Sequence, residues 1–108
     1  HALHLMRQRR ARYFSGDDAH FRAFDDVFLT MEGSGQWLVY RYLLSPAGGA
    51  ATPEAALAET RRGGRWWTQD EGLALVLVLD RLLPDWRERM FRDPDWLAEN
   101  LLAAAVAG

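Results

Sequence analysis

Apolar residues recur along this chain in steps of three and four, the spacing that places them on one face of an α-helix. The longest such run extends from about residue 17 to residue 44, and its stripe consists of Phe21, Phe24, Phe28, Met31, Gly35, Leu38 and Tyr42. Beyond Trp37 the segment becomes apolar almost all round, as in a helix surrounded by other elements. The pattern predicts a long helix that runs into the core with its stripe buried.

Further helices are predicted on both sides of this one. Thr52, Pro53 and Glu54 are typical of a helix start, because Thr caps free amides and proline fits the first helical position. Thr68-Gln69-Asp70-Glu71 has the form of a capping box. Helices are expected at about 1–14, 53–60, 68–83, 84–91 and from 94 onward, with Asp17 or Asp18 capping the long one. The predicted fold class is all-α, a compact helical bundle of about five or six helices in one domain, 1–108.

Two segments of the chain resemble each other. Residues 28–35 and 67–74 align without gaps, each with an aromatic residue four positions before a Glu-Gly pair. The similarity has two interpretations: chance likeness between two buried helices, or a pseudo-symmetric pair of helices that cross near the glycines.

Gly33 and Gly35 need a physical reason, since a glycine inside a helix costs about 1 kcal/mol relative to alanine. Two glycines within one turn predict that something approaches this backbone closely. A neighbouring helix is one explanation. A functional site is the other, because Glu32 lies beside the gap, where a carboxylate is costly unless it is paired, protonated or bound to a metal.

Composition excludes several classes of function. The net charge is −2, so the chain has no overall basic field of the kind that attracts nucleic acid. It has no cysteine, which excludes disulfides and thiolate metal sites. No apolar run reaches the ~18 residues of a transmembrane helix. We therefore expect no nucleic-acid partner and no membrane span.

From Met31 to Trp37 the chain reads Met-Glu-Gly-Ser-Gly-Gln-Trp and resembles the second zinc-ligand helix of gluzincin metallopeptidases, a family that includes aminopeptidases and thermolysin-like proteins. Glu32 matches the ligand glutamate, Gly33 the glycine, Gly35 the small position and Trp37 the aromatic one. The resemblance implies a zinc site completed by Glu32, with the histidines supplied by an upstream His-Glu-x-x-His helix. Two histidines and a carboxylate leave a fourth zinc position for water.

His1 precedes Glu32 in the order that this resemblance requires, and it is the candidate for the last histidine of that motif. His1 and His4 are three residues apart, not four, so the first histidine and the catalytic glutamate would lie outside this sequence. The chain is then expected to be the C-terminal part of a larger zinc metallopeptidase-like protein and inactive alone. Its partners would be a peptide substrate or the missing N-terminal part of the same protein.

Three alternatives stay open. Glu71 fits the same Glu-Gly pattern and is the rival site glutamate, although the capping box gives it a structural role. A non-catalytic helical interaction domain, with Glu32 in a buried structural pair, is the rival function. The third is a binding module that uses the basic, Trp-containing loop 61–67. His20, near the start of the long helix, is expected on the surface.

Overall fold

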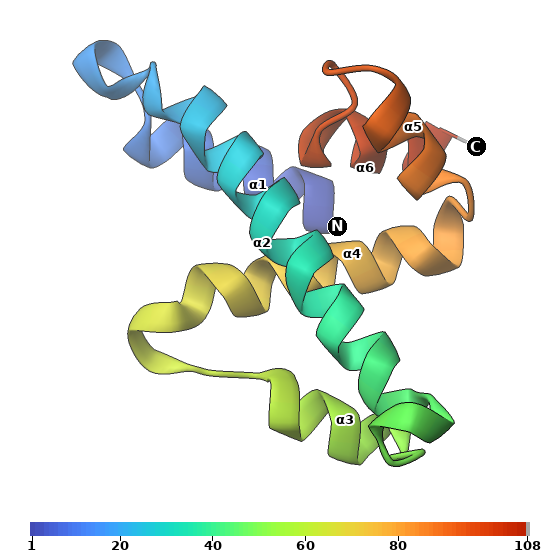
Figure 1. The fold of residues 1–108 in the computed structure, drawn as a ribbon. Helices are drawn as coiled ribbons and strands as arrows, with labels where there is room; N and C mark the ends of the chain where they lie inside the picture. Colours follow the sequence, from blue (N-terminus) through green and yellow to red (C-terminus); the bar gives the residue numbers. More distant parts are fainter. Residues whose placement is uncertain (108) are drawn as a thin grey trace.

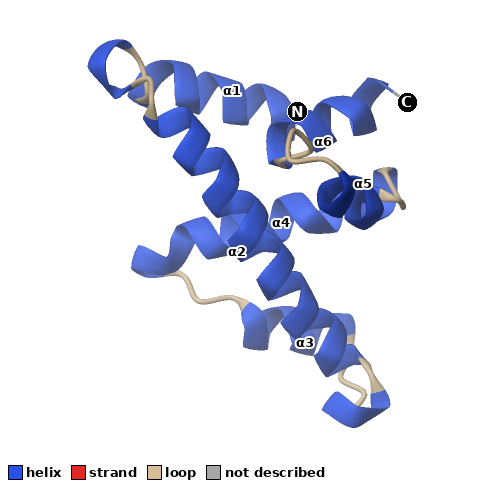
Figure 2. Cartoon of the chain, turned by 45° about the horizontal axis from the view of Figure 1, so that its top comes forward, coloured by secondary structure: helices blue, strands red, loops and turns tan. Residues whose placement is uncertain are grey.

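The computed structural model describes residues 1–107 and contains six α-helices and no strand in that range, which confirms the all-α prediction. Figures 1 and 2 show a long central helix with the others around it. The α-helices are α1 (Ala2–Tyr13), α2 (Phe21–Leu44), α3 (Pro53–Thr60), α4 (Trp67–Leu82), α5 (Trp86–Arg92) and α6 (Ala98–Ala107). Three short 3-10 turns lie between them: η1 (Gly16–Asp18), η2 (Pro46–Gly48) and η3 (Gly64–Trp66).

The centre of the fold is the crossing of α2 and α4 (Figures 1 and 2). Two glycines, Gly33 and Gly72, meet at this crossing. A Cβ atom on Gly72 would lie 2.8 Å from the amide nitrogen of Gly33 and 2.9 Å from the carbonyl oxygen of Leu29. A Cβ atom on Gly33 would overlap the carbonyl group of Gly72. The two backbones can touch only because both positions are glycine. Of the two interpretations of the similar segments, the one in which their helices cross near the glycines agrees with this contact.

The core surrounds this crossing and draws residues from α1, α2, α4, α5 and α6. Trp37 of α2 packs edge-on against Trp86 of α5, with ring centroids 5.2 Å apart. Six large side chains are almost completely buried: Leu29, Leu73, Leu79, Trp86, Leu101 and Leu102. Burial of this kind contributes roughly 1.5–3 kcal/mol per side chain.

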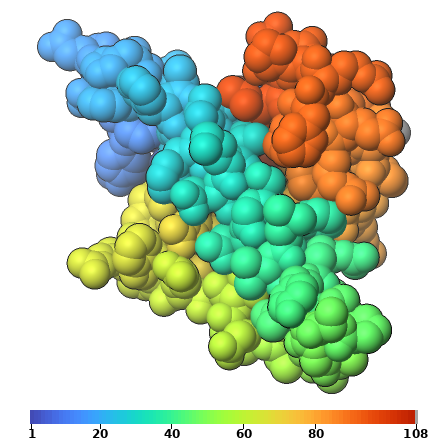
Figure 3. Space-filling view, viewed as in Figure 1, coloured from blue at the N-terminus to red at the C-terminus, as the bar shows by residue number. Residues whose placement is uncertain are grey.

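The predicted stripe of α2 lies on the wrong side of the helix. The buried face is formed by Leu29, Thr30, Gly33 and Trp37, whereas the residues of the stripe are exposed. Figure 3 shows α2 crossing the front of the molecule, where the exposed side of the helix is not covered by other elements. The helix is apolar on two faces, so periodicity alone could not decide between them. Each face also carries a glycine, and in the structure α4 packs on the face of Gly33 and buries it.

The expectation for Gly35 is also wrong within the described chain. A Cβ atom placed on Gly35 would meet nothing within 4 Å. This glycine lies on the exposed side of α2, and no segment of residues 1–107 packs on it.

Several predicted helix starts differ from the structure. Thr52 caps α3 as expected, its Oγ1 accepting from the amide of Ala55 at 3.2 Å. Asp17 and Asp18 lie in η1 instead, and α2 begins at Phe21 with no side-chain cap. The predicted helices at 84 and 94 begin later, at Trp86 and Ala98.

The capping box at the start of α4 does not form. The helix begins at Trp67, one residue before Thr68, and no side chain caps it. Asp70 faces backward and accepts from the amides of Arg62 and Gly63 at 2.9 and 2.8 Å. The hydrogen bond from the Arg62 amide lowers the pKa of Asp70. Asp70 therefore secures the loop before α4.

This difference gives a first test. Asp70→Ala should lower the free energy of unfolding by about 1 kcal/mol, because two loop amides lose their acceptor. Thr68→Ala is the matched control in the same helical turn and should change it by less than about 0.5 kcal/mol, since Thr68 caps nothing. Urea unfolding of the two variants measures both. If Thr68→Ala lost more unfolding free energy than Asp70→Ala, the capping box would be the better description of this helix start.

Candidate functional site

Glu32 lies midway along α2, directly before the glycine that contacts α4, and it is half-buried. No hydrogen bond or ion pair among residues 1–107 uses its carboxylate. Every other half-buried carboxylate in this range has a partner: Asp25, Asp26, Asp70, Glu71, Asp80, Asp93 and Glu99. Glu32 is the exception. Its carboxylate keeps contact with solvent, since its oxygens are not among the fully buried side-chain atoms that lack a partner.

The rival glutamate, Glu71, is already engaged. Its Oε1 lies 3.4 Å from Nη2 of Arg9, and this arginine also stacks over the ring of Trp67 at 5.7 Å. Burial raises the pKa of Glu71, with Arg9 acting against that effect. Glu71 thus holds α4 to α1, and Glu32 is the better candidate for a site glutamate.

A buried ion network ties α1 to α2 and α6. The side chain of Arg10 is about 5% exposed and donates to three carboxylates, Asp25 at 2.8 Å, Asp26 at 3.1 Å and Glu99 at 2.7 Å. Burial alone would lower the pKa of Arg10, but the carboxylates of Asp25 and Asp26 raise it above its ordinary value. Arg10 is therefore a charged residue of the core. In the sequence, Arg10 follows Leu3 and Met6 at helical spacing, and this spacing is the one sign there that Arg10 shares a face with these core residues.

The first amides of α6 are also held by α2. The amide of Ala98 donates to Oγ1 of Thr30 at 2.9 Å, and the amide of Glu99 donates to Oδ1 of Asp26 at 3.0 Å. These side chains replace a local cap, which explains why α6 begins at Ala98 and not at Asp93-Pro94. These two hydrogen bonds hold the start of α6 against the N-terminal half of α2, which precedes Glu32.

His1 and His4 belong to the N-terminal end of α1, and both are exposed. In Figures 1 and 2 this end of α1 lies near α6, which α1 contacts. No ion pair joins either histidine to Glu32, and no three His, Asp or Glu side chains of residues 1–107 come together as metal ligands. The donor types of His1 and Glu32 suit zinc. Residues 1–107 do not bring three such donors together, so a zinc site that used His1 and Glu32 would need a further ligand from outside them.

The other sequence candidates are on the surface. His20 is exposed beside the ring of Phe21, with centroids 4.1 Å apart. In the basic loop, the guanidinium groups of Arg62 and Arg65 both lie over the ring of Trp66, at 5.4 and 5.3 Å. The loop therefore satisfies its own cation–π contacts, and its amides are taken by Asp70 as described above.

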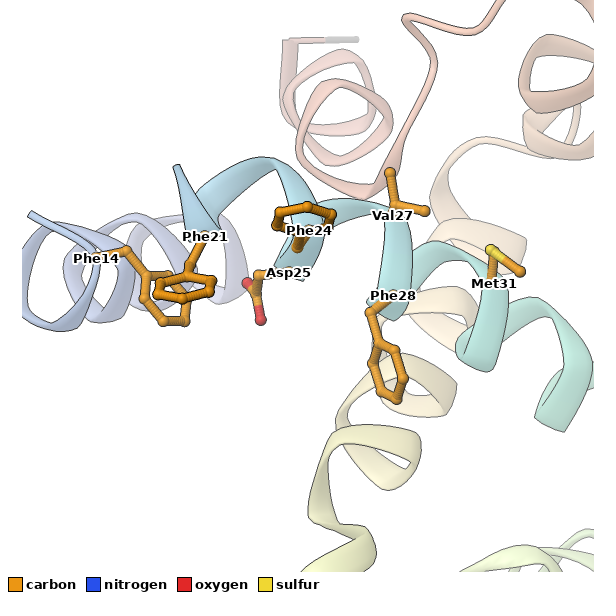
Figure 4. A pocket seen from close by; sticks show the side chains of 7 residues that line it. All are labelled: Phe14, Phe21, Phe24, Asp25, Val27, Phe28 and Met31. Carbon is orange, nitrogen blue, oxygen red and sulfur yellow. The ribbon is translucent and has the colours of Figure 1, made fainter. Parts of the chain in front are cut away.

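An open apolar pocket of about 410 Å³ lies on the exposed face of α2. Figure 4 shows its lining, with the rings of Phe14 and Phe21 close together at one end and Met31 at the other. The pocket is lined by Phe14, Phe21, Phe24, Asp25, Val27, Phe28 and Met31. The only charged member, Asp25, is paired with Arg9 and Arg10. The pocket thus offers apolar contact and no free charge.

Comparison with known proteins gives no relative: no family model, no curated protein and no solved structure matches this chain. Among the described residues, no helix combines the length and the apolar character that crossing a membrane requires.

Proposed function

We propose that this chain is the C-terminal, glutamate-supplying part of a zinc metallopeptidase-like protein. The observation that carries the proposal is the unpaired, half-buried carboxylate of Glu32. The other half-buried acids of residues 1–107 all have hydrogen-bond or ion-pair partners within the protein. A carboxylate without such a partner is available to bind a metal ion.

The surroundings of Glu32 fit this role in two ways. It lies directly beside the crossing at which the backbones of α2 and α4 are in close contact, at Gly33 and Gly72. Arg10 also joins α1, the helix that begins at His1, to α2 by short ion pairs. A rigid support of this kind is what a metal ligand needs.

In the proposed site, Glu32 and His1 would be two of three protein ligands, and the third would come from residues before His1. Zinc bound there would act as a Lewis acid and activate water for peptide hydrolysis. The tasks of this chain are to present the Glu32 carboxylate without a competing arginine and to keep α1 attached to α2.

Metal analysis tests this proposal. A version of the protein extended before His1 by a His-Glu-x-x sequence should bind one equivalent of zinc, and the 108-residue chain should bind it weakly or not at all. Glu32→Gln in the extended protein should remove the zinc, because the amide is a poor ligand. Glu71→Gln is the matched control and should keep it. Zinc that survives Glu32→Gln, or an extended protein without zinc, would reject the proposal.

A second candidate function is favoured by a different observation. The exposed apolar face of α2 is typical of a helical interaction domain. The buried pair assigned to Glu32 under this alternative is absent from residues 1–107. The argument for an interaction domain therefore rests only on the exposed apolar face of α2.

A further inference from the structure

The exposed face of α2 has the spacing of a coiled-coil seam. Its residues follow one another in alternating steps of three and four over three heptads, which is the pattern of a and d positions. With about 100° per residue, every residue within roughly 60° of the direction opposite Gly33 is apolar or glycine. These residues, which we call the α2 seam, are Phe21, Phe24, Val27, Phe28, Met31, Gly35, Leu38, Val39 and Tyr42.

The area of the α2 seam is that of a protein–protein interface. Eight of its side chains are 41–68% exposed. With roughly 150–200 Å² for each large side chain, the seam presents on the order of 700 Å² of apolar surface. The largest apolar patch of a typical monomer is about 300–600 Å², and a stable dimer buries about 600–1,000 Å² on each partner. The α2 seam is therefore large enough to hold a second copy of this chain.

Gly35 indicates what kind of element covers the seam. It costs about 1 kcal/mol in the middle of a helix, and nothing in residues 1–107 uses the space that it leaves. Within the fold, the same device at Gly33 admits the backbone of another helix. Gly35 therefore leaves a gap in the seam, which we call the notch. The notch can accept a side chain that protrudes from a helix packed along the seam.

We propose that the α2 seam pairs with the α2 seam of a second copy, with the two helices antiparallel. In this register Met31 fills the notch at the partner's Gly35, and the exchange is repeated by the two-fold symmetry. The flexible thioether of Met31 suits such a gap. The same register sets Phe28 against the partner's Leu38 and Phe24 against the partner's Tyr42. At the edge of the seam the two Glu32 carboxylates approach each other and oppose the pairing.

Sedimentation of the 108-residue protein tests the pairing. An interface of this area should give a dimer at or below micromolar concentration. Phe24→Glu and Met31→Glu should each weaken the dimer at least 100-fold. Both side chains are about two-thirds exposed and lie outside the core, so the helical circular dichroism should not change. Phe91→Glu is the control, because Phe91 is 82% exposed on α5 and lies outside the seam. A monomeric parent protein, as expected if a different polypeptide covers the seam, would overturn the proposal.

The register has its own test, since the chain contains no cysteine. The double variant Phe24→Cys/Tyr42→Cys should form a disulfide-linked dimer under mild oxidation, and Phe24→Cys alone should not. Gly35→Leu should weaken the dimer, because it closes the notch, and Glu32→Gln should strengthen it. Efficient cross-linking of Phe24→Cys to itself would indicate parallel helices and overturn the register. None of these outcomes depends on zinc, so the pairing and the metal site can be rejected independently of each other.

Discussion

Gly33→Ala should lower the free energy of unfolding by about 3 kcal/mol, at the upper end of what overpacking costs. The new methyl group would overlap the backbone carbonyl group of Gly72, and backbone atoms at a helix crossing cannot rotate away as a side chain can. Relief would require α2 and α4 to separate, which would also loosen Leu29 and Leu73 on either side of the crossing. Alanine favours a helix by about 1 kcal/mol over glycine, but the steric cost exceeds that gain.

Gly35→Ala is the matched control in the same helix, and it should raise the free energy of unfolding by up to about 1 kcal/mol. Its methyl group would enter open space within the chain. Both substitutions are best compared in the Phe24→Glu background, so that association through the α2 seam does not contribute. Urea unfolding gives the two values. Equal losses of unfolding free energy for the two variants, or no loss for either, would show that the backbone contact at Gly33 does not contribute as proposed.

The pair of glycines also shows what the sequence could and could not predict. The likeness of segments 28–35 and 67–74 suggested a crossing near the glycines as one of two interpretations. It could not separate Gly33 from Gly35, which lie within one turn but on opposite faces of α2. Only the position of α4 distinguishes them, and that position follows from packing across the whole fold.

Helix ends were predicted well where the cap is local and poorly where it is distant. Thr52 and Pro53 set the start of α3 from within three residues of it. The start of α6 is held by Thr30 and Asp26, about seventy positions earlier in the chain. Spacing along the sequence carries no information about such partners, so the prediction placed this helix four residues too early.

For the candidate site, the sequence identified Glu32 from the Glu-Gly pattern, but it could not separate this residue from Glu71. The separation comes from tertiary contacts, because Arg9 forms an ion pair with Glu71, and no arginine of residues 1–107 forms one with Glu32. The zinc role of Glu32 and His1 stays a prediction. The run of arginines at residues 7, 9, 10 and 12 is most simply interpreted from the sequence as a solvated helix face, but in the structure Arg10 is buried.

Arg10→Met should lower the free energy of unfolding by about 3 kcal/mol or more at neutral pH. Methionine fills much of the same volume, so packing loss is small. The cost arises mainly at Asp26, whose side chain is only 16% exposed and which loses its one ion pair among residues 1–107. Asp25, only 10% exposed, loses one of its two cations and keeps Arg9. Breaking a buried ion pair by removing one partner typically costs 3–5 kcal/mol, since the other charge is left uncompensated.

Arg7→Met is the control for charge alone. Arg7 makes one ion pair, with Glu99 at 2.9 Å, and its side chain is 56% exposed. An exposed pair contributes about 0–1 kcal/mol, so this variant should stay close to the parent. A loss as large as that of Arg10→Met would mean that the net charge of α1, and not the buried network, holds the helix in place.

The effect of Arg10→Met should depend on pH in a defined direction. Burial acts to raise the pKa of Glu99, but Arg7 and Arg10 lower it below its ordinary value. A carboxylate with a lowered pKa stabilises the fold above its unfolded pKa, and this contribution is lost as the pH falls through the folded one. The difference between parent and Arg10→Met should therefore be largest near neutral pH and shrink below about pH 4, where carboxylates take up protons. Urea unfolding at several pH values measures this difference. A gap that stays constant across the range would show that Arg10 acts through packing and not through its charge.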